Sequence, residues 1–272
     1  MKKSLVIIFL ISSILTTIVV SAFVGGIYEE FAFFENSNSN YLELEGNLDV
    51  DGFLLSRSVP QYVIDSMHGS KRNTIYYALR NYPNAVFGFF SQEDIYFDDE
   101  RDMHFIPRAD LTLSASGFRG AVASDPGVYM IFPSFRWHRN ANIQNDRFAF
   151  TLNGNNWVTI TGAVGSVHMN ITGRFSNVSQ TFHIDRPSAS SFFGQSYTFL
   201  TGINNTQFEG TAVMYARRVP NGDLNDRQIM ISYAHDRSAF NNTPIGVTLD
   251  IFYISFTPSS GNVITTSEII SW

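Results

Sequence analysis

Cysteine is absent from the 272 residues, and lysine is nearly so. Without cysteine the chain can form no disulfide, no thiolate metal site and no lipid anchor at a signal-peptide cysteine. Lys2 and Lys3 stand at the start, and Lys71 is the only lysine after them. Lysine on an exposed edge strand prevents that strand from pairing with another chain. Protein interfaces are depleted in lysine and enriched in arginine. The scarcity of lysine therefore favours a protein that assembles with itself or with other proteins.

Positive charge is scarce as well. The chain has 18 basic and 24 acidic side chains, and removing Lys2 and Lys3 with the N-terminal segment leaves 16 basic ones and a formal charge of −8. Phosphate backbones and anionic membranes repel such a surface. We therefore expect no nucleic-acid partner and no general binding to lipid headgroups.

The N-terminal segment has the pattern of a secretory signal peptide. Two lysines precede an apolar run from Leu5 to Val20, and Ser21 and Ala22 supply the small residues of a cleavage site. This pattern predicts a signal peptide over residues 1–22, cut after Ala22, and a secreted, cell-surface or periplasmic protein. The alternative is an uncleaved anchor, because Phe23 and Val24 extend the run towards membrane-spanning length. Only in that case do we expect the protein to be held at a membrane.

The rest of the chain predicts a packed, all-β protein. Hydrophobic residues make up 44% of the sequence and aromatic ones 15%, which excludes disorder as a general description. We expect an aromatic segment and an Asn/Ser linker over residues 23–40, followed by a single domain over residues 41–272. Strict alternation from Tyr41 to Asp51 predicts a half-buried first strand.

Helical spacing occurs in only one part of this domain. Pro60 can open a helix that Gly69 ends, and residues 73–81 have the spacing of a second helix, so we expect one or two short helices near residues 60–82. After residue 85 short alternating strands follow one another with turn clusters between them, and we expect Val247–Phe256 to be a strand and 186–195 to be a long loop. The pattern predicts an antiparallel β-sandwich, jelly-roll-like in topology. An outer-membrane β-barrel is the alternative with the same alternation.

Acidic residues gather in two places that could hold calcium. The denser cluster comprises Asp94, Asp98, Asp99, Glu100 and Asp102. Calcium prefers several oxygen ligands, so these five carboxylates form the candidate metal site, with a solvated acidic loop as the alternative. The segment 47–52 resembles the opening of an EF-hand loop, but its twelfth position is Ser58 rather than an acidic residue. We expect no other cofactor.

An aromatic patch provides a candidate ligand-binding site. Phe135 and Trp137 alternate with Arg136 and Arg139, and aromatic faces beside cations can stack on sugar rings. The candidate ligand-binding residues are therefore Phe135, Trp137 and Arg139. Packing of the same rings in a core or an interface is the alternative.

No catalytic motif has the residue spacing that a particular reaction requires. We therefore predict an exported, non-enzymatic protein of the cell envelope or cell surface, which acts by self-assembly or by binding another surface protein. The alternatives are a carbohydrate-binding module or glycan-active enzyme, with a glycan as partner, and the outer-membrane barrel. The sequence resembles no family that we recognise.

Overall fold

The computed structural model describes the strand-rich part of the chain. Its described residues are 49–94, 111–120, 127–138, 145–160, 168–175, 178–184, 187–200, 205–223, 226–236, 245–257 and 263–272. The predicted signal peptide, the segment 23–40 and most of the strand predicted from Tyr41 lie outside these ranges. Within them, no helix has both the length and the apolar composition needed to cross a membrane.

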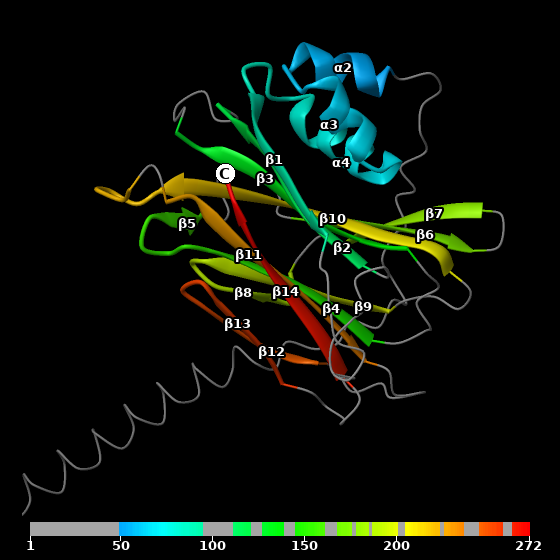
Figure 1. The fold of residues 1–272 in the computed structure, drawn as a ribbon, viewed down its shortest axis with the longest axis vertical. Coiled ribbons are helices and arrows are strands. Elements are labelled where there is room, and N and C mark those ends of the chain that lie inside the picture. The colour runs from blue at the N-terminus through cyan, green and yellow to red at the C-terminus, as the bar shows by residue number, and fades with distance from the viewer. Residues whose placement is uncertain are drawn as a thin grey trace, which may run out of the picture. The chain divides into compact units, whose positions relative to one another are not determined.

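Two antiparallel sheets form the body of the molecule (Figure 1). The larger sheet has the order β1 (Val86–Asp94), β2 (Leu111–Arg119), β3 (Tyr129–Trp137), β10 (Asn205–Arg218), β6 (His168–Phe175) and β7 (Val178–Ile184), with β5 (Trp157–Thr159) also paired to β10. The smaller sheet has the order β14 (Val263–Ser271), β11 (Gln228–Asp236), β4 (Asn145–Leu152), β9 (Gly194–Leu200) and β8 (Ala189–Ser190). These open sheets confirm the predicted antiparallel β-sandwich.

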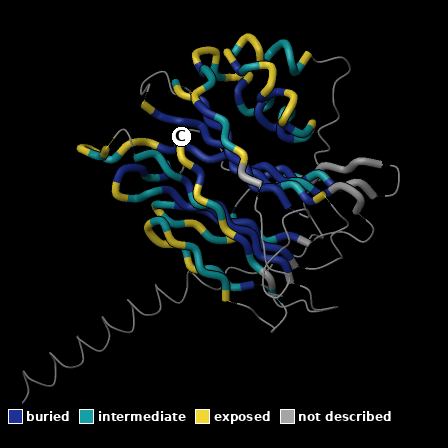
Figure 2. Tube along the Cα trace, viewed as in Figure 1, coloured by how far each residue is buried: buried dark blue, intermediate teal, exposed yellow. Residues whose placement is uncertain are grey.

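The main hydrophobic core lies between the two sheets. Alternate residues of each strand point inwards, as Leu111, Leu113 and Ala115 do from β2, and Phe148, Phe150 and Leu152 from β4. This is the period of two that the sequence displays, because successive side chains of a strand point to opposite faces. Figure 2 shows both sheets buried over most of their length, with exposed residues mainly in turns and on the outer helix surfaces.

A layer of three helices covers the outer face of the larger sheet and creates a second core. The helices are α2 (Val50–Ser56), α3 (Gln61–Ser66) and α4 (Gly69–Leu79). Their apolar residues pack on the outward side chains of the sheet, including Phe118, Phe132, Val213 and Tyr215. Strand β2 is therefore buried on both faces. Helices α3 and α4 confirm the prediction near residues 60–82, although Gly69 begins α4 instead of ending a helix.

Helix α2 corrects the prediction of a strand that continues to Asp51. Asp49 caps this helix, because its Oδ1 accepts a hydrogen bond of 2.7 Å from the backbone N–H of Gly52. Asp51 lies in the first turn and pairs with Arg72 of α4 at 2.9 Å. Both carboxylates of the EF-hand-like segment are therefore occupied in holding the helical layer.

Replacing Asp49 with alanine should lower the free energy of unfolding by about 1 kcal/mol, since a lost N-cap leaves helix N–H groups without an acceptor. Urea denaturation followed by circular dichroism measures the change. Asp65→Ala is the matched control, because Asp65 lies inside α3, accepts a hydrogen bond of 2.9 Å from Gln61 and caps no helix. An equal loss in both variants would contradict the role of Asp49 as a cap.

The C-terminal region and the segment 186–195 also differ from the prediction. Val247–Phe256 is not one strand but a hairpin of β12 (Gly246–Asp250) and β13 (Tyr253–Thr257), which turns at Ile251 and Phe252. The expected long loop contains β8, a short turn at residues 191–193 and the start of β9. The sequence does not predict these two turns, because they contain apolar residues and turns are recognised mainly by glycine, proline and asparagine.

Candidate functional site

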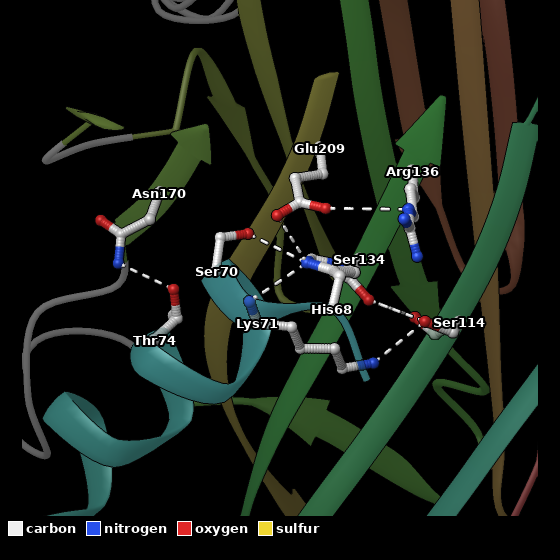
Figure 3. Close-up of polar contacts among 9 residues, drawn as sticks. All are labelled: His68, Ser70, Lys71, Thr74, Ser114, Ser134, Arg136, Asn170 and Glu209. Atoms are coloured by element: carbon white, nitrogen blue, oxygen red, sulfur yellow. Dashed lines mark hydrogen bonds and ion pairs between the residues drawn. The ribbon is translucent and has the colours of Figure 1, made fainter. Parts of the chain in front are cut away.

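Two rows of polar side chains cross the outer face of the larger sheet beside the helical layer. One row runs in register through Gln92, Ser114, Ser134, Thr211, Asn170 and His183, and the next through Thr112, Arg136, Glu209 and Thr172. The start of α4 lies over these rows, and its buried face there is polar, with Lys71 and Thr74. Figure 3 shows the residues that meet at this place, which we call the α4 cluster: His68, Ser70, Lys71, Ser114, Ser134, Arg136 and Glu209.

Lys71 is the most deeply buried titratable member of the α4 cluster, with 1% of its surface exposed. Its Nζ lies 3.0 Å from Oγ of Ser114 and 5.2 Å from the centre of the Phe90 ring. Burial lowers the pKa of Lys71 from 10.5 to about 7, because an ammonium loses its hydration there. Ser114 Oγ also lies 2.8 Å from Oγ of Ser134. The amine and the two hydroxyls thus form one short chain of hydrogen bonds.

His68 and Glu209 form a second pair within the α4 cluster. Nδ1 of His68 lies 2.9 Å from Oε1 of Glu209 and 3.2 Å from the backbone N of Lys71. A carboxylate only accepts, so the shorter contact places the proton on Nδ1, and the longer one cannot then be a hydrogen bond. Nε2 of His68 is buried without a hydrogen-bond partner among the described residues.

Electrostatics keep the pair as a neutral imidazole and a carboxylate. Burial lowers the pKa of His68, although Glu209 opposes that effect. Burial raises the pKa of Glu209, but hydrogen bonds from His68 and Ser70 and the charge of Arg136 outweigh it and hold that pKa below its usual value. Nε of Arg136 lies 3.9 Å from Glu209 Oε2, and 40% of the Arg136 side chain is exposed. The α4 cluster therefore has one charged, accessible rim.

Two of the three candidate ligand-binding residues are part of the inter-sheet core. Phe135 is 1% exposed and Trp137 is 6% exposed. Phe135 stacks on Phe199, and Trp137 packs against Tyr233 and the ring of His235. A sugar ring has no free aromatic face to stack on here, so we assign both residues to packing. Arg139 lies outside the described residues.

The candidate calcium ligands remain a prediction. Asp94 ends β1, and its side chain is not among those described. Asp98, Asp99, Glu100 and Asp102 lie outside the described residues. Where side chains are described, no group of three or more histidine and carboxylate residues is arranged to hold a metal.

A second candidate site is an exposed apolar surface at one end of the smaller sheet. We define the Phe192 surface by Phe192, Ile251 and Tyr253, which are 79%, 44% and 54% exposed. Phe192 lies in the turn between β8 and β9, and the other two lie at the turn of the β12–β13 hairpin. Both turns bind the end of β4: Thr151 donates to Asp250 O at 3.0 Å, and Leu152 N donates to Phe193 O at 2.8 Å.

The turn that carries Phe192 is held firmly. Thr159 donates to Phe192 O through its backbone N at 2.8 Å and through its hydroxyl at 3.0 Å. Ser191 Oγ accepts from the backbone N of Phe193 and of Gly194 at 3.2 and 3.1 Å. The ring therefore projects from a fixed backbone, which lowers the entropy that a partner must overcome on binding.

The hairpin turn is unusual in composition. Two-residue hairpin turns favour Asn-Gly and Asp-Gly, whereas this one is Ile251-Phe252. Phe252 has a φ of 48°, a left-handed conformation that is costly for a bulky side chain. Strain of this kind is concentrated at functional sites. The strained apolar turn and the turn that carries Phe192 both bond to the end of β4, which makes this region a candidate binding surface.

Comparison with known proteins assigns no family. No protein-family model matches the chain, and no curated protein is similar in sequence. Among solved structures, the enzymatically active domain of tailspike protein 4 from bacteriophage CBA120 aligns at 8% identity and a TM-score of 0.21 over 57% of this chain. The aligned region covers 19% of that neighbour's length. A likeness this weak carries no argument about function.

Proposed function

We propose that this chain is an exported protein of the cell envelope or cell surface that binds other proteins through the Phe192 surface, and that its first partner is a second copy of itself. The observation that carries the proposal is Phe192, a ring that is 79% exposed on a turn held by several hydrogen bonds. Rigid, exposed aromatic side chains are the usual anchors of protein interfaces. The pattern of residues 1–22 supports export.

The charges around the Phe192 surface favour a second copy. Asp250 lies exposed at the hairpin turn, and Arg217 and Arg218 lie exposed on β10 beside β5, the strand that binds Phe192. A rim with both signs is self-complementary, because a two-fold axis can bring the acid of one copy to the bases of the other. Elsewhere the formal charge of the chain makes two copies repel each other.

The distribution of lysine supports the same proposal. Lys71 is buried, so the described surface presents no lysine at all. Strand β14 is an edge strand nine residues long, with a continuous register against β11 and Ile269 45% exposed. Edges of this kind are usually protected by lysine, proline or a bulge. β14 has none of the three, which suits a protein that assembles.

Phe192→Ala should weaken self-association by about 30-fold, the effect of removing an interface anchor worth about 2 kcal/mol. Sedimentation velocity of the exported protein over a range of concentrations measures the dissociation constant. A double variant, Ile251→Asn with Phe252→Gly, tests the hairpin side of the surface, because Asn-Gly suits the same turn. We expect it to weaken association as well.

Tyr62→Ala is the matched control. Tyr62 is 73% exposed, but it lies on α3, in the helical layer. Association should be unchanged in this variant. A wild-type protein that stays monomeric at high concentration would remove self-association, and an equal effect of Tyr62→Ala would remove the Phe192 surface as its site.

A further inference from the structure

Lys71, the single lysine after the N-terminal pair, lies where burial of an amine is highly unfavourable. Lys71 is enclosed by the helical layer and the larger sheet, and among the described residues the Ser114 hydroxyl is the only hydrogen-bond partner of its Nζ. A purely structural position would be filled more favourably by an apolar side chain, since an ammonium loses its hydration there. Perturbed buried amines are concentrated at functional sites, where a neutral amine serves as a base. This placement calls for a chemical role.

Its geometry matches a base and a nucleophile. Covalent catalysis needs a hydroxyl within hydrogen-bond reach of a base, with a third group that orients the pair. Lys71 Nζ and Ser114 Oγ are 3.0 Å apart, and Ser134 Oγ is 2.8 Å from Ser114 Oγ. When the amine is neutral, the hydroxyl of Ser114 donates to Nζ, which is the direction of proton transfer that activates the serine. Ser–Lys pairs are a recognised variant of such sites.

We propose that Ser114 is an acyl-accepting nucleophile and Lys71 its general base, at a hydrolytic site for small carboxylic esters that is separate from the Phe192 surface. Ser134 is a positioning residue, because it contacts the serine and not the amine. Small esters are favoured because Ser114 is 8% exposed, so a bulky acyl group has no room. The approach is from the side of Gln92, which is exposed and lies opposite Ser114 on β1.

The reaction is balanced by these groups and water. Ser114 Oγ bonds to the acyl carbon while Lys71 takes its proton, and the bond from that carbon to the alkoxy oxygen breaks. The ammonium of Lys71 returns the proton to the departing alcohol. Water then adds to the acyl carbon, again giving a proton to Lys71, and the bond to Ser114 Oγ breaks. The products are an alcohol and a carboxylic acid, and the serine and amine are restored.

The charges near the amine are compatible with a neutral base at neutral pH. His68 at the start of the same helix, Glu209 on β10 and Arg136 on β3 are the charged or titratable groups of the α4 cluster around it. β1 and β2 present Phe90, Gln92 and Ser114 on this face. Burial lowers the pKa of His68, and hydrogen bonds from His68 and Ser70 hold the pKa of Glu209 below its usual value, so both shifts lead away from the pKa of Lys71 at about 7. A pH profile between 6 and 8 therefore reports mainly on Lys71.

A fluorophosphonate probe tests the proposal directly, because it forms a P–O bond with an activated serine and releases fluoride. The full chain is incubated with the probe at pH 6, 7 and 8, and the modified peptide is located by mass spectrometry. We expect labelling at Ser114 that rises with pH around a midpoint near 7. Lys71→Met should lower the labelling rate by about 100-fold, the usual contribution of a general base. Ser134→Ala should slow labelling without moving the midpoint.

Ser116→Ala is the matched control. Ser116 lies two residues further along β2 on the same face, is fully buried, and has no partner for its Oγ in the described structure. This variant should be labelled like the wild type, whereas Ser114→Ala should not be labelled. Folding of each variant is checked by its thermal transition. Native wild-type protein without modification at Ser114, or labelling that Lys71→Met leaves unchanged, would overturn the proposal, and neither result would bear on self-association.

Discussion

Lys71→Met is expected to raise the free energy of unfolding at pH 7 by about 3–5 kcal/mol. Burial lowers the pKa of Lys71 from 10.5 to about 7, and each unit is equivalent to about 1.4 kcal/mol of preference for the neutral form. The folded protein therefore bears the cost of deprotonating or burying the amine, and the unfolded chain does not. Methionine has a similar length, needs no hydration and contributes apolar contacts in the same space.

The pH dependence of this effect has a definite sign. Between pH 7 and 10.5 the unfolded chain holds one proton more than the folded protein at this position, so wild-type stability should rise with pH. Below pH 7 both states are protonated, and the cost of the buried ammonium remains in full. The advantage of the variant should therefore be largest below pH 7 and fade towards pH 10.5. Burial raises the pKa of Tyr215, which lowers stability only above about pH 10.

Urea denaturation at pH 6, 7, 8 and 9 measures both the gain and its slope. Arg72→Met is the matched control, since Arg72 is the next residue but is half-exposed and paired with Asp51. That variant should lose a little stability, by the same amount at each pH, because it keeps Lys71. A Lys71→Met protein less stable than the wild type at pH 7 would mean that the amine is stabilising, against the argument from its burial.

Phe135→Ala should destabilise the protein by about 3–5 kcal/mol, the range for removing a buried aromatic ring. Its ring contacts those of Phe148, Phe199, Phe208 and Tyr233, with centroids 4.7 to 5.5 Å apart. Strands of both sheets supply these partners, so the cavity would open in the middle of the inter-sheet core.

The midpoint of urea unfolding at pH 7 measures the loss. Phe192→Ala is the control for removing a phenylalanine as such, and it should change stability by less than about 0.5 kcal/mol because Phe192 is exposed. If Phe135→Ala were as mild as the control, the ring would be accessible, and the glycan-binding interpretation of Phe135 would return.

Much of the sandwich could be predicted from local alternation. Leu111, Leu113 and Ala115 face the inter-sheet core as their spacing indicates, and the strand ends at turn residues. The helical layer could be predicted only in part. Val213 and Tyr215 have the period of a strand, but their contacts are with helices that precede them by well over a hundred residues. Alternation indicates that a face is buried and does not reveal what covers it.

The α4 cluster and the Phe192 surface could not be predicted from the sequence, for different reasons. Lys71 and Ser114 are 43 residues apart, and their meeting depends on how α4 packs on β2. The one available signal was that Lys71 is the only lysine after the first three residues. Phe192 and Ile251 lie in turns without the usual turn residues, so the sequence predicts a loop around Phe192 and a strand through Ile251. The alternating rings of Phe135 and Trp137 fit a ligand-binding site and a packed core equally well, because exposure cannot be read from alternation alone.

Strand order sets when the chain can fold. β10 lies between β3 and β6, and β11 lies between β4 and β14, so a central strand of each sheet comes from the last third of the sequence. Strands β3, β4 and β6 each lack one partner strand until those residues have been synthesised. Contacts between residues this distant in sequence form slowly. A nascent chain therefore cannot complete either sheet until most of its residues have been synthesised.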